Sequence, residues 1–268
     1  MSFSDGKAMG NGRVHLVGAG PGDPGLLTVE ATRLLQTADV VFHDDLVSPE
    51  ILEMIPERVH VENVGKRCGQ ASITQDQIHS LLINAAREGW KVVRLKSGDP
   101  LVYGRAGEEL DALRRAGIAC EVVPGITAAF GAAARAGITL TDRRLASKLV
   151  FLSNHECAGK YSLDEEGARA QDSTVVVYMP GTDYERLAVR LCAEGLDPDT
   201  PCLVVSCATT PRQEVHFTRL AALTEGPGWS TPAVLIVGAV AARYSQSMPD
   251  NLEATAGQPF LLDFQLSS

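Results

Sequence analysis

The first 123 residues alternate between short runs of β-branched residues and segments whose apolar residues recur at helical spacing. Such alternation leaves few folds open, because strands joined through helices pair side by side in the same direction. The expected strands are 14–17, 40–43, 59–62, 91–96 and 120–123, and the clearest expected helices are 27–38, 75–87 and 105–115. The pattern predicts a mostly parallel, doubly wound α/β sheet.

The pattern changes after Pro124 and Gly125, a dipeptide typical of a turn. An Ala/Gly-rich helix is expected at 128–136, followed by strands at 148–153, 174–179, 202–207, 214–218 and 233–237. Few helical segments separate the last strands, which favours a mixed sheet over a second parallel one. We therefore expect an N-terminal α/β domain over 13–124, a C-terminal α/β domain over 125–245, and tails at 1–12 and 246–268.

Composition narrows the functional classes. Hydrophobic residues make up 45% of the 268 and charged residues 21%, as in a folded globular protein. No apolar run reaches the roughly 18 residues that span a membrane, and the N-terminus lacks an apolar signal core, so we expect a cytoplasmic protein. The net charge of -9 argues against nucleic-acid binding, which needs clustered Lys and Arg. The six cysteines form no Cys-x-x-Cys pair, which argues against metal or disulfide roles.

A loop rich in glycine and proline, 18–25, follows the first expected strand and precedes a helix, where dinucleotide folds bind phosphate. The dinucleotide fingerprint fails, because Asp23 occupies its third glycine position. Pro21 and Pro24 also remove backbone N–H groups that a pyrophosphate needs. The loop therefore suits a ligand with adenosine but no phosphate, such as S-adenosylmethionine, unless it is only a tight structural turn.

A second loop, 97–100, ends the fourth expected strand. Strand carboxyl ends line the ligand crevice of open α/β sheets, where a carboxylate can accept ribose hydroxyls and a glycine lets the backbone approach a ligand. Three more charged residues lie at or just beyond strand ends, where parallel strands would bring them to one cleft: Asp44, Lys66 and Arg105. Each feature alone is also consistent with a capped turn or a solvated loop.

Five segments of the chain occur in a characteristic order. They are VGAGPGDPGLLT at 17–28, VGKR at 64–67, RLKSGDP at 94–100, GRAGEE at 104–109 and VPGIT at 123–127. Together they resemble the tetrapyrrole (precorrin) methyltransferase family, and within it the uroporphyrinogen-III C-methyltransferases. The resemblance extends from about residue 14 to residue 244.

The resemblance implies a two-domain α/β homodimer that holds S-adenosylmethionine folded between its domains and needs no metal. It implies C-methylation of uroporphyrinogen III on rings A and B to give precorrin-2, which leads to siroheme, cobalamin or heme d1, with S-adenosylhomocysteine as the other product. The family's cofactor contacts correspond to Pro21, Ser97, Gly98, Asp99, Val102, Thr127, Ala128, Met179 and Ala208. Its acid/base pair corresponds to Asp44 and Lys66, and its catalytic, substrate-handling arginine and glutamate to Arg105 and Glu108, with Arg143 as a further substrate contact.

The substrate that the resemblance implies carries many carboxylates, which bidentate arginines match geometrically. A local rim of arginines could therefore offset the unfavourable net charge; its members would be Arg105, Arg135, Arg143 and Arg144. A carboxylate such as Asp44 suits removal of the proton that leaves the substrate's bridge carbon. For Arg143 and Arg144, a solvated loop is an equally good interpretation.

Several positions depart from the residues usual in the family, namely Ser97, Arg135, Thr139, Asp142 and Asn154. The departures at Ser97 and Arg135 leave open a paralogue that methylates a later precorrin. A second alternative is a nicotinamide-dependent dehydrogenase with Asp44 on a ribose, against which the two loop prolines and the missing glycine argue. A third is a binding module that holds the cofactor and transfers no methyl group.

Overall fold

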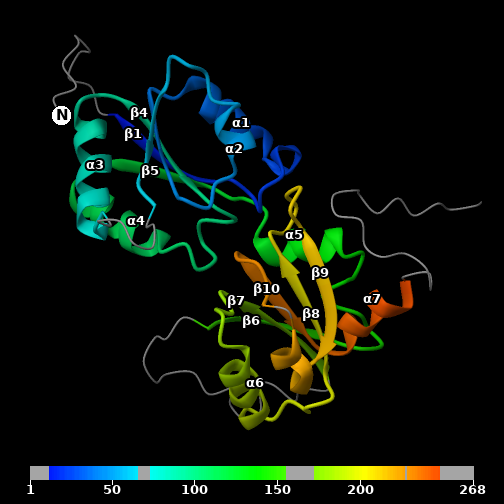
Figure 1. Cartoon of the computed structure of the whole chain (residues 1–268). Helices are drawn as coiled ribbons and strands as arrows, with labels where there is room; N and C mark the ends of the chain where they lie inside the picture. The colour runs from blue at the N-terminus through cyan, green and yellow to red at the C-terminus, as the bar shows by residue number, and fades with distance from the viewer. Residues whose placement is uncertain (1–11, 66–72, 155–171, 227, 248–268) are drawn as a thin grey trace, which may run out of the picture. The chain divides into compact units, whose positions relative to one another are not determined.

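The computed structural model describes residues 12–65, 73–154, 172–226 and 228–247 (Figure 1). The chain forms two compact units, Met1–Thr127 and Ala128–Ser268, each with its own five-stranded sheet and its own hydrophobic core. Among the helices of the described residues, none is both long enough and apolar enough to cross a membrane.

All five strands of the N-terminal unit run in the same direction. They are β1 (Arg13–Gly18), β2 (Val40–His43), β3 (His60–Asn63), β4 (Lys91–Lys96) and β5 (Ala119–Val123). Their order across the sheet is β3-β2-β4-β1-β5, so β4 is the central strand and β1 is its neighbour. The predicted parallel, doubly wound α/β sheet is confirmed.

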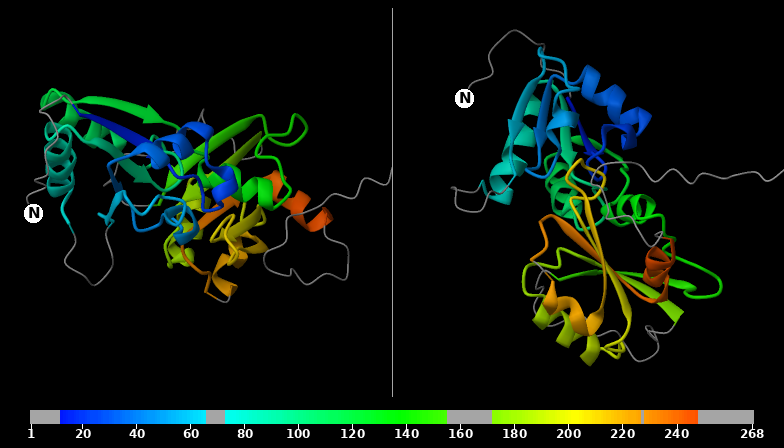
Figure 2. Two further views of the ribbon diagram at one scale, coloured as in Figure 1. Left: turned by 90° about the horizontal axis from the view of Figure 1, so that it is seen from above. Right: turned by 45° about the vertical axis from the view of Figure 1, so that its right-hand side comes forward.

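Helices cover both faces of this sheet. They are α1 (Val29–Thr37), α2 (Pro49–Leu52), α3 (Gln75–Arg87) and α4 (Ala106–Arg115), with a 3-10 turn η1 (Pro24–Leu26). Threonines begin two of them: Thr28 caps α1, and Thr74 forms a capping box with Gln77 at the start of α3. The helices α3 and α4 pack together on one face of the sheet, and α1 lies on the other (Figure 1, Figure 2).

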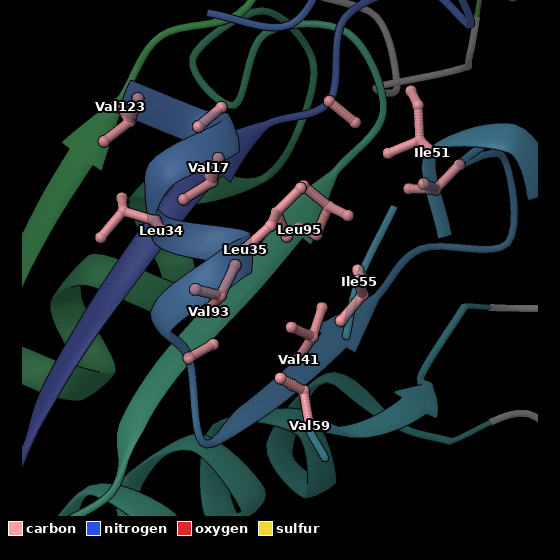
Figure 3. Close-up of a cluster of buried hydrophobic side chains, with 14 residues drawn as sticks. Val17, Leu34, Leu35, Val41, Ile51, Ile55, Val59, Val93, Leu95 and Val123 are labelled. Atoms are coloured by element: carbon pink, nitrogen blue, oxygen red, sulfur yellow. The ribbon is translucent and has the colours of Figure 1, made fainter. Parts of the chain in front are cut away.

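The alternation of side chains along β4 decides which of them meet which helices. Val93 and Leu95 pack with α1 in the cluster that Figure 3 shows. Val92 packs with residues of α3 and α4 on the other face. Because successive side chains of a strand point to opposite faces, Arg94 and Lys96 share the face of Val92, and both are buried. The sheet therefore places two cations beneath α4.

The C-terminal unit begins with α5 (Ala128–Arg135) and contains a mixed sheet. Its strands are β6 (Lys148–Ser153), β7 (Ser173–Tyr178), β8 (Pro201–Ser206), β9 (Glu214–Arg219) and β10 (Ala233–Val237). Their order is β6-β7-β10-β8-β9; β6 and β7 pair in parallel, and the other three pairs are antiparallel. The predicted mixed sheet is confirmed.

Short helices complete the C-terminal unit: α6 (Tyr184–Ala193), η3 (Leu220–Glu225), η4 (Ala239–Ala241) and α7 (Ala242–Ser247). We did not predict α6 from the sequence, although its signals are present. Asp183 caps it by accepting from Arg186 N–H at 3.0 Å, and Leu187 and Leu191 follow at helical spacing on its buried face. This face covers β7 and β8 and completes the core.

Candidate active site

The order of strands in the N-terminal sheet marks where a ligand would bind. From β1 the chain passes through α1 to β2, and from β4 it passes through α4 to β5, in the opposite direction across the sheet. Ligands of open α/β sheets bind at such switch points, outside the strand carboxyl ends. The loops after β1 and β4 hold the predicted cofactor residues Pro21, Ser97, Gly98, Asp99 and Val102.

Backbone hydrogen bonds join these two loops directly. Gly20 N–H donates to the Gly98 carbonyl at 3.1 Å, and Gly98 N–H donates to the Gly20 carbonyl at 2.8 Å. Both glycines have positive φ, +71° and +68°, which residues with side chains rarely adopt. A Cβ atom on Gly18 would lie 2.5 Å from Gly125 N and 2.7 Å from the Gly98 carbonyl oxygen. The loops after β1, β4 and β5 are therefore in contact at their backbones, and we call them the three joined loops.

Asp99 links two of the three joined loops. Its Oδ1 accepts from Leu101 N–H at 2.8 Å, within its own loop, and its Oδ2 accepts from Gly125 N–H at 2.9 Å, in the loop after β5. A carboxylate oxygen has two lone pairs, so each oxygen keeps capacity for another donor. Asp99 thus has a structural role that we did not predict, beside the cofactor contact that stays a prediction.

The other predicted contacts of this unit lie on the same loops. Pro21 and Ser97 are half-buried, and Val102 N–H donates to the Asp99 carbonyl at 3.2 Å. Thr127, the last residue of the unit, is buried. The fold therefore brings together, on one backbone scaffold, residues that are up to 106 positions apart in sequence, from Pro21 to Thr127 (127 minus 21).

The predicted contacts of the C-terminal unit gather at one end of its sheet. β7 and β8 flank β10 and both run antiparallel to it, so their carboxyl ends lie at the same end. Met179 directly follows β7, and Ala208 lies two residues beyond β8. In the first turn of α5, Ala129 N–H donates to the Tyr178 hydroxyl at 3.3 Å, which ties the start of α5, and with it Ala128, to the end of β7.

Unusual backbone conformations coincide with these segments. The non-glycine residues with positive φ in the described chain are Tyr103, Arg105, Met179, Cys207 and Thr209. Such a conformation costs about 1–3 kcal/mol per residue and persists at functional sites where surrounding structure enforces it. Two of the five flank Gly104 before α4, one is a predicted contact, and two flank Ala208. Strain is thus concentrated in the segments that the sequence assigned to the site.

Asp44, just beyond β2, contacts two buried cations of β4. Arg94 Nη2 donates to Asp44 Oδ1, and Lys96 Nζ lies 4.0 Å from Asp44 Oδ2. Both cations also contact Glu109 of α4: Arg94 Nε donates to Oε1 at 3.1 Å, and Lys96 Nζ lies 3.2 and 3.1 Å from the two carboxylate oxygens. The side chain of Glu109 is fully buried, those of Arg94 and Lys96 are 3% exposed, and that of Asp44 is 30% exposed. We call these four residues the charge cluster.

Burial and neighbouring charges act on both cations of the charge cluster. Burial and the nearby guanidinium of Arg94 lower the pKa of Lys96. Burial also disfavours the charged form of Arg94, but the carboxylates of Asp44 and Glu109 outweigh it and raise the pKa of Arg94. Of these four residues, only Asp44 was predicted as a site residue from the sequence. The overlooked signal lies in β4, where Arg94 and Lys96 occupy alternate positions of an otherwise apolar strand interior. Charged side chains are rarely buried unless they are paired, so this pattern predicts carboxylate partners for both.

Arg105 and Glu108 form a second ion pair, at the start of α4. Arg105 Nε donates to Glu108 Oε1 at 2.7 Å and Nη2 donates to Oε2 at 2.6 Å, and this bidentate contact raises the pKa of Arg105. Both side chains are 49% exposed. The helix begins at Ala106, with Arg105 as its N-cap, one residue later than predicted. In this geometry the Glu108 carboxylate fixes the direction of the Arg105 guanidinium.

The remaining predicted residues differ in what surrounds them. Lys66 lies outside the described residues. Arg143 is exposed in the C-terminal unit. Its neighbour Arg144 forms a bidentate pair with Asp142, with Nε and Nη2 donating at 3.0 and 2.7 Å, and holds the pKa of Asp142 well below its usual range. Arg144 is thus already paired with a carboxylate two residues away, that of Asp142. This pairing favours the solvated-loop interpretation for Arg144.

Comparisons with known proteins agree with this arrangement. A family model, Tetrapyrrole (Corrin/Porphyrin) Methylases, matches residues 13–224. The crystal structure of uroporphyrin-III C-methyl transferase from Thermus thermophilus complexed with S-adenyl homocysteine is 40% identical, with a TM-score of 0.75 over 87% of this chain and 100% of that chain.

Curated relatives are also similar to this chain in sequence. Uroporphyrinogen-III C-methyltransferase of Paracoccus denitrificans is 47% identical over 243 residues, 88% of this chain and 84% of that protein. The chloroplastic S-adenosyl-L-methionine-dependent uroporphyrinogen III methyltransferase of Arabidopsis thaliana is 45% identical over 236 residues, 86% of this chain and 64% of that protein. The chain spans about half the length of the siroheme synthases that it also matches. On the strength of these matches and of the two sheets described above, the chain belongs to the tetrapyrrole (corrin/porphyrin) methylase family.

Proposed function

We propose that the chain transfers methyl groups from S-adenosylmethionine to carbons of uroporphyrinogen III, on rings A and B, giving precorrin-2 and S-adenosylhomocysteine. The observation that carries the proposal is the set of three joined loops at the switch point of the parallel sheet, linked by the Gly20–Gly98 and Asp99–Gly125 hydrogen bonds. The 47% identity to a uroporphyrinogen-III C-methyltransferase, over 84% of its length, supports this choice of substrate.

The three joined loops suit a sulfonium cofactor better than a dinucleotide. Pro21 and Pro24 have no N–H, and the N–H groups of Gly20 and Gly98 already donate to each other's carbonyls. Few backbone donors therefore remain for a pyrophosphate, which argues against the nicotinamide-dependent dehydrogenase. The free lone pairs of Asp99 suit ribose hydroxyls, which a nucleoside cofactor also carries. When bound, S-adenosylmethionine supplies a methyl group on a positively charged sulfur.

The residues of the chain then have two tasks. The first is to hold the nucleophilic pyrrole carbon in line with the methyl group, and good orientation of this kind contributes on the order of 7–11 kcal/mol of barrier reduction. We assign this task to the Arg105–Glu108 pair, whose guanidinium is already fixed in direction. The second is to accept the proton that leaves the bridge carbon as the new C–C bond forms. Asp44 suits it, because its carboxylate is partly exposed and a hydrogen bond from Arg94 fixes its orientation.

Two further assignments rest on the family resemblance. Lys66 would be the acid/base partner of Asp44, and Met179, Ala128 and Ala208 would contact the cofactor from the C-terminal unit. Arg143 is our candidate for a substrate carboxylate, because its side chain is exposed whereas Arg144 is held by Asp142. The unusual residues Ser97, Arg135 and Asp142 keep a later precorrin as the alternative substrate.

We further propose that the protein is a cytoplasmic homodimer acting on a small molecule, with no nucleic-acid or membrane partner. The dimer rests on the family resemblance. The net charge of -9 supports the lack of a nucleic-acid partner, since phosphate binding needs an excess of local cations. The siroheme synthases among the relatives support siroheme synthesis as one route that precorrin-2 would enter.

One experiment separates these possibilities. The purified chain is incubated with methyl-labelled S-adenosylmethionine and, in parallel reactions, with uroporphyrinogen III or with precorrin-2, without added metal. Two labelled methyl groups per uroporphyrinogen and precorrin-2 absorbance are the expected result. Label entering only precorrin-2 would establish the paralogue, and cofactor binding without transfer in either reaction would establish a binding module.

A further inference from the structure

We propose that Arg94, held in place by Glu109, is a positioning residue that orients the Asp44 carboxylate for proton removal. The inference rests on the proposed function, because it takes Asp44 as the proton acceptor. It goes beyond that function in assigning a role to two buried residues of β4 and α4 that are not among the predicted cofactor, substrate or catalytic residues. Each step follows from the contacts of the charge cluster.

The guanidinium of Arg94 is held in one orientation. Its Nε donates to Glu109 at 3.1 Å, and its Nη1 donates to the carbonyls of Phe42 and Leu95 at 3.4 and 3.2 Å. The third nitrogen, Nη2, donates to Asp44 Oδ1. All three nitrogens thus have acceptors, so the side chain cannot turn without losing buried hydrogen bonds, each of which is costly to leave unmade. Arg94 donates to Oδ1, so Oδ2 is the Asp44 oxygen that Arg94 leaves open to an incoming proton.

Charged groups of two other elements surround Asp44. Arg94 and Lys96 of β4 face it as cations, and Glu109 of α4 lies behind them as an anion. Nδ1 of His43, the last residue of β2, lies 2.9 Å from the Asp44 carbonyl oxygen. Two cations against one anion leave one net positive charge toward Asp44. Since Arg94 and Lys96 are buried, water and salt screen that charge less than they would at the surface.

Charge balance ties Asp44 to the three buried members of the cluster. Arg94, Lys96 and Glu109 alone would leave one uncompensated positive charge in the protein interior, which is strongly unfavourable. The Asp44 carboxylate supplies the missing negative charge, and it is also the most exposed member of the cluster. The buried cations therefore face Asp44, and Arg94 donates to it, and Asp44 is the member of the cluster most open to a substrate.

The test is a double-mutant cycle on methyl transfer from S-adenosylmethionine to uroporphyrinogen III. The variants are Asp44→Asn, Arg94→Lys, the combination of both, and Glu109→Gln, which keeps the size of Glu109 and removes its charge. Lysine keeps the charge of Arg94 but cannot make its four contacts at once. Arg114→Lys is the matched control, because Arg114 forms an exposed ion pair with Asp111 on the same helix as Glu109. Melting temperature and S-adenosylhomocysteine affinity are measured for each.

We expect Asp44→Asn to lower kcat by about 10²- to 10⁴-fold, as loss of an acid/base group does. Arg94→Lys and Glu109→Gln should each lower kcat about tenfold or more, with the KM for S-adenosylmethionine within about twofold of the original value, and Arg114→Lys should change neither. In the Asp44→Asn background, Arg94→Lys should lower kcat by less than about twofold further, because Arg94 acts through Asp44.

Three outcomes would overturn the inference. Multiplicative losses in the double variant would mean that Arg94 acts independently of Asp44. A rise in KM with unchanged kcat would make Arg94 a binding residue. Failure of both Arg94→Lys and Glu109→Gln to fold, with Asp44→Asn stable, would make the pair structural. By contrast, no methyl transfer by the unaltered chain would refute the proposed function itself, so the two failures are distinguishable.

Discussion

Asp99 Oδ2 accepts the Gly125 N–H at 2.9 Å, and this hydrogen bond joins the loop after β4 to the loop after β5 across 26 residues of sequence. The same carboxylate closes its own loop through Leu101. Asp99, which the family motif indicates as a cofactor contact, therefore also stabilises the loops. Its substitution should affect both folding and binding.

We expect Asp99→Ala to lower the free energy of unfolding by about 1–3 kcal/mol, because it leaves two backbone N–H groups without their acceptor. It should also weaken S-adenosylhomocysteine binding. Asp44→Asn should leave that binding nearly unchanged and reduce turnover. Urea unfolding and calorimetry check both variants, and equal loss of cofactor affinity in the two would contradict the division of roles.

The close approach of the three joined loops makes Gly18 intolerant of a side chain. In Gly18→Ala the new methyl group would lie 2.5 Å from Gly125 N and 2.7 Å from the Gly98 carbonyl oxygen, both backbone atoms. We expect a loss of about 1–3 kcal/mol of stability or more, as in other overpacked sites, together with weaker cofactor binding.

Gly107→Ala is the matched control for Gly18→Ala. Gly107 lies in the first turn of α4, and a Cβ atom there meets nothing within 4 Å. Alanine is the better helix former by about 1 kcal/mol, so this variant should be as stable as the original chain or slightly more stable. If both glycine variants melted at the original temperature, the three joined loops would not be packed as described.

Arg105 tests whether an ion pair at a strained position serves catalysis. Arg105 has φ of +56°, and its side chain is half exposed in the pair with Glu108. We expect Arg105→Lys and Arg105→Ala to keep S-adenosylhomocysteine affinity, to stay within about 1 kcal/mol in stability, and to lose methylation of uroporphyrinogen III. Arg105→Gly should lose activity without losing stability, because glycine accepts positive φ. Near-normal turnover in Arg105→Ala would remove the assigned role.

We expect the protein to lose stability at alkaline pH as Tyr184 ionises. Burial raises the pKa of Tyr184 from 10.0 to about 12. The folded state then holds this proton more tightly than the unfolded state, so the corresponding stability is complete below pH 10 and is lost as the pH rises from about 10 to about 12. In Tyr184→Phe this part of the loss should disappear.

At neutral pH, Tyr184→Phe should be neutral or stabilising. The Tyr184 hydroxyl is buried, and no described residue is its hydrogen-bond partner, so phenylalanine removes a polar group that burial disfavours. Thermal unfolding followed at pH 7, 10 and 11.5 checks both statements. A steeper alkaline loss in the phenylalanine variant than in the original chain would contradict the assignment to Tyr184.

The sequence by itself determined the architecture of both sheets. Local patterns decide whether a segment forms a strand or a helix, and several boundaries, such as those of β2, α3 and β4, agree with the predicted ranges to the residue. Connection lengths then decide parallel or mixed pairing. The short α6 was overlooked because its signals, the Asp183 cap and the Leu187–Leu191 spacing, follow segments that read as strands.

Only the tertiary structure decided which charges act together. Asp44 directly follows β2, whereas Arg94 and Glu109 belong to β4 and α4. Their contact depends on the strand order that puts β2 beside β4 and on α4 covering that face. The same holds for Asp99 and Gly125, whose hydrogen bond needs β1, β4 and β5 to end side by side. The periodicity of apolar residues shows which face of each helix or strand is buried. It carries no information on which distant segment covers that face, because that choice is made by packing across the whole sheet.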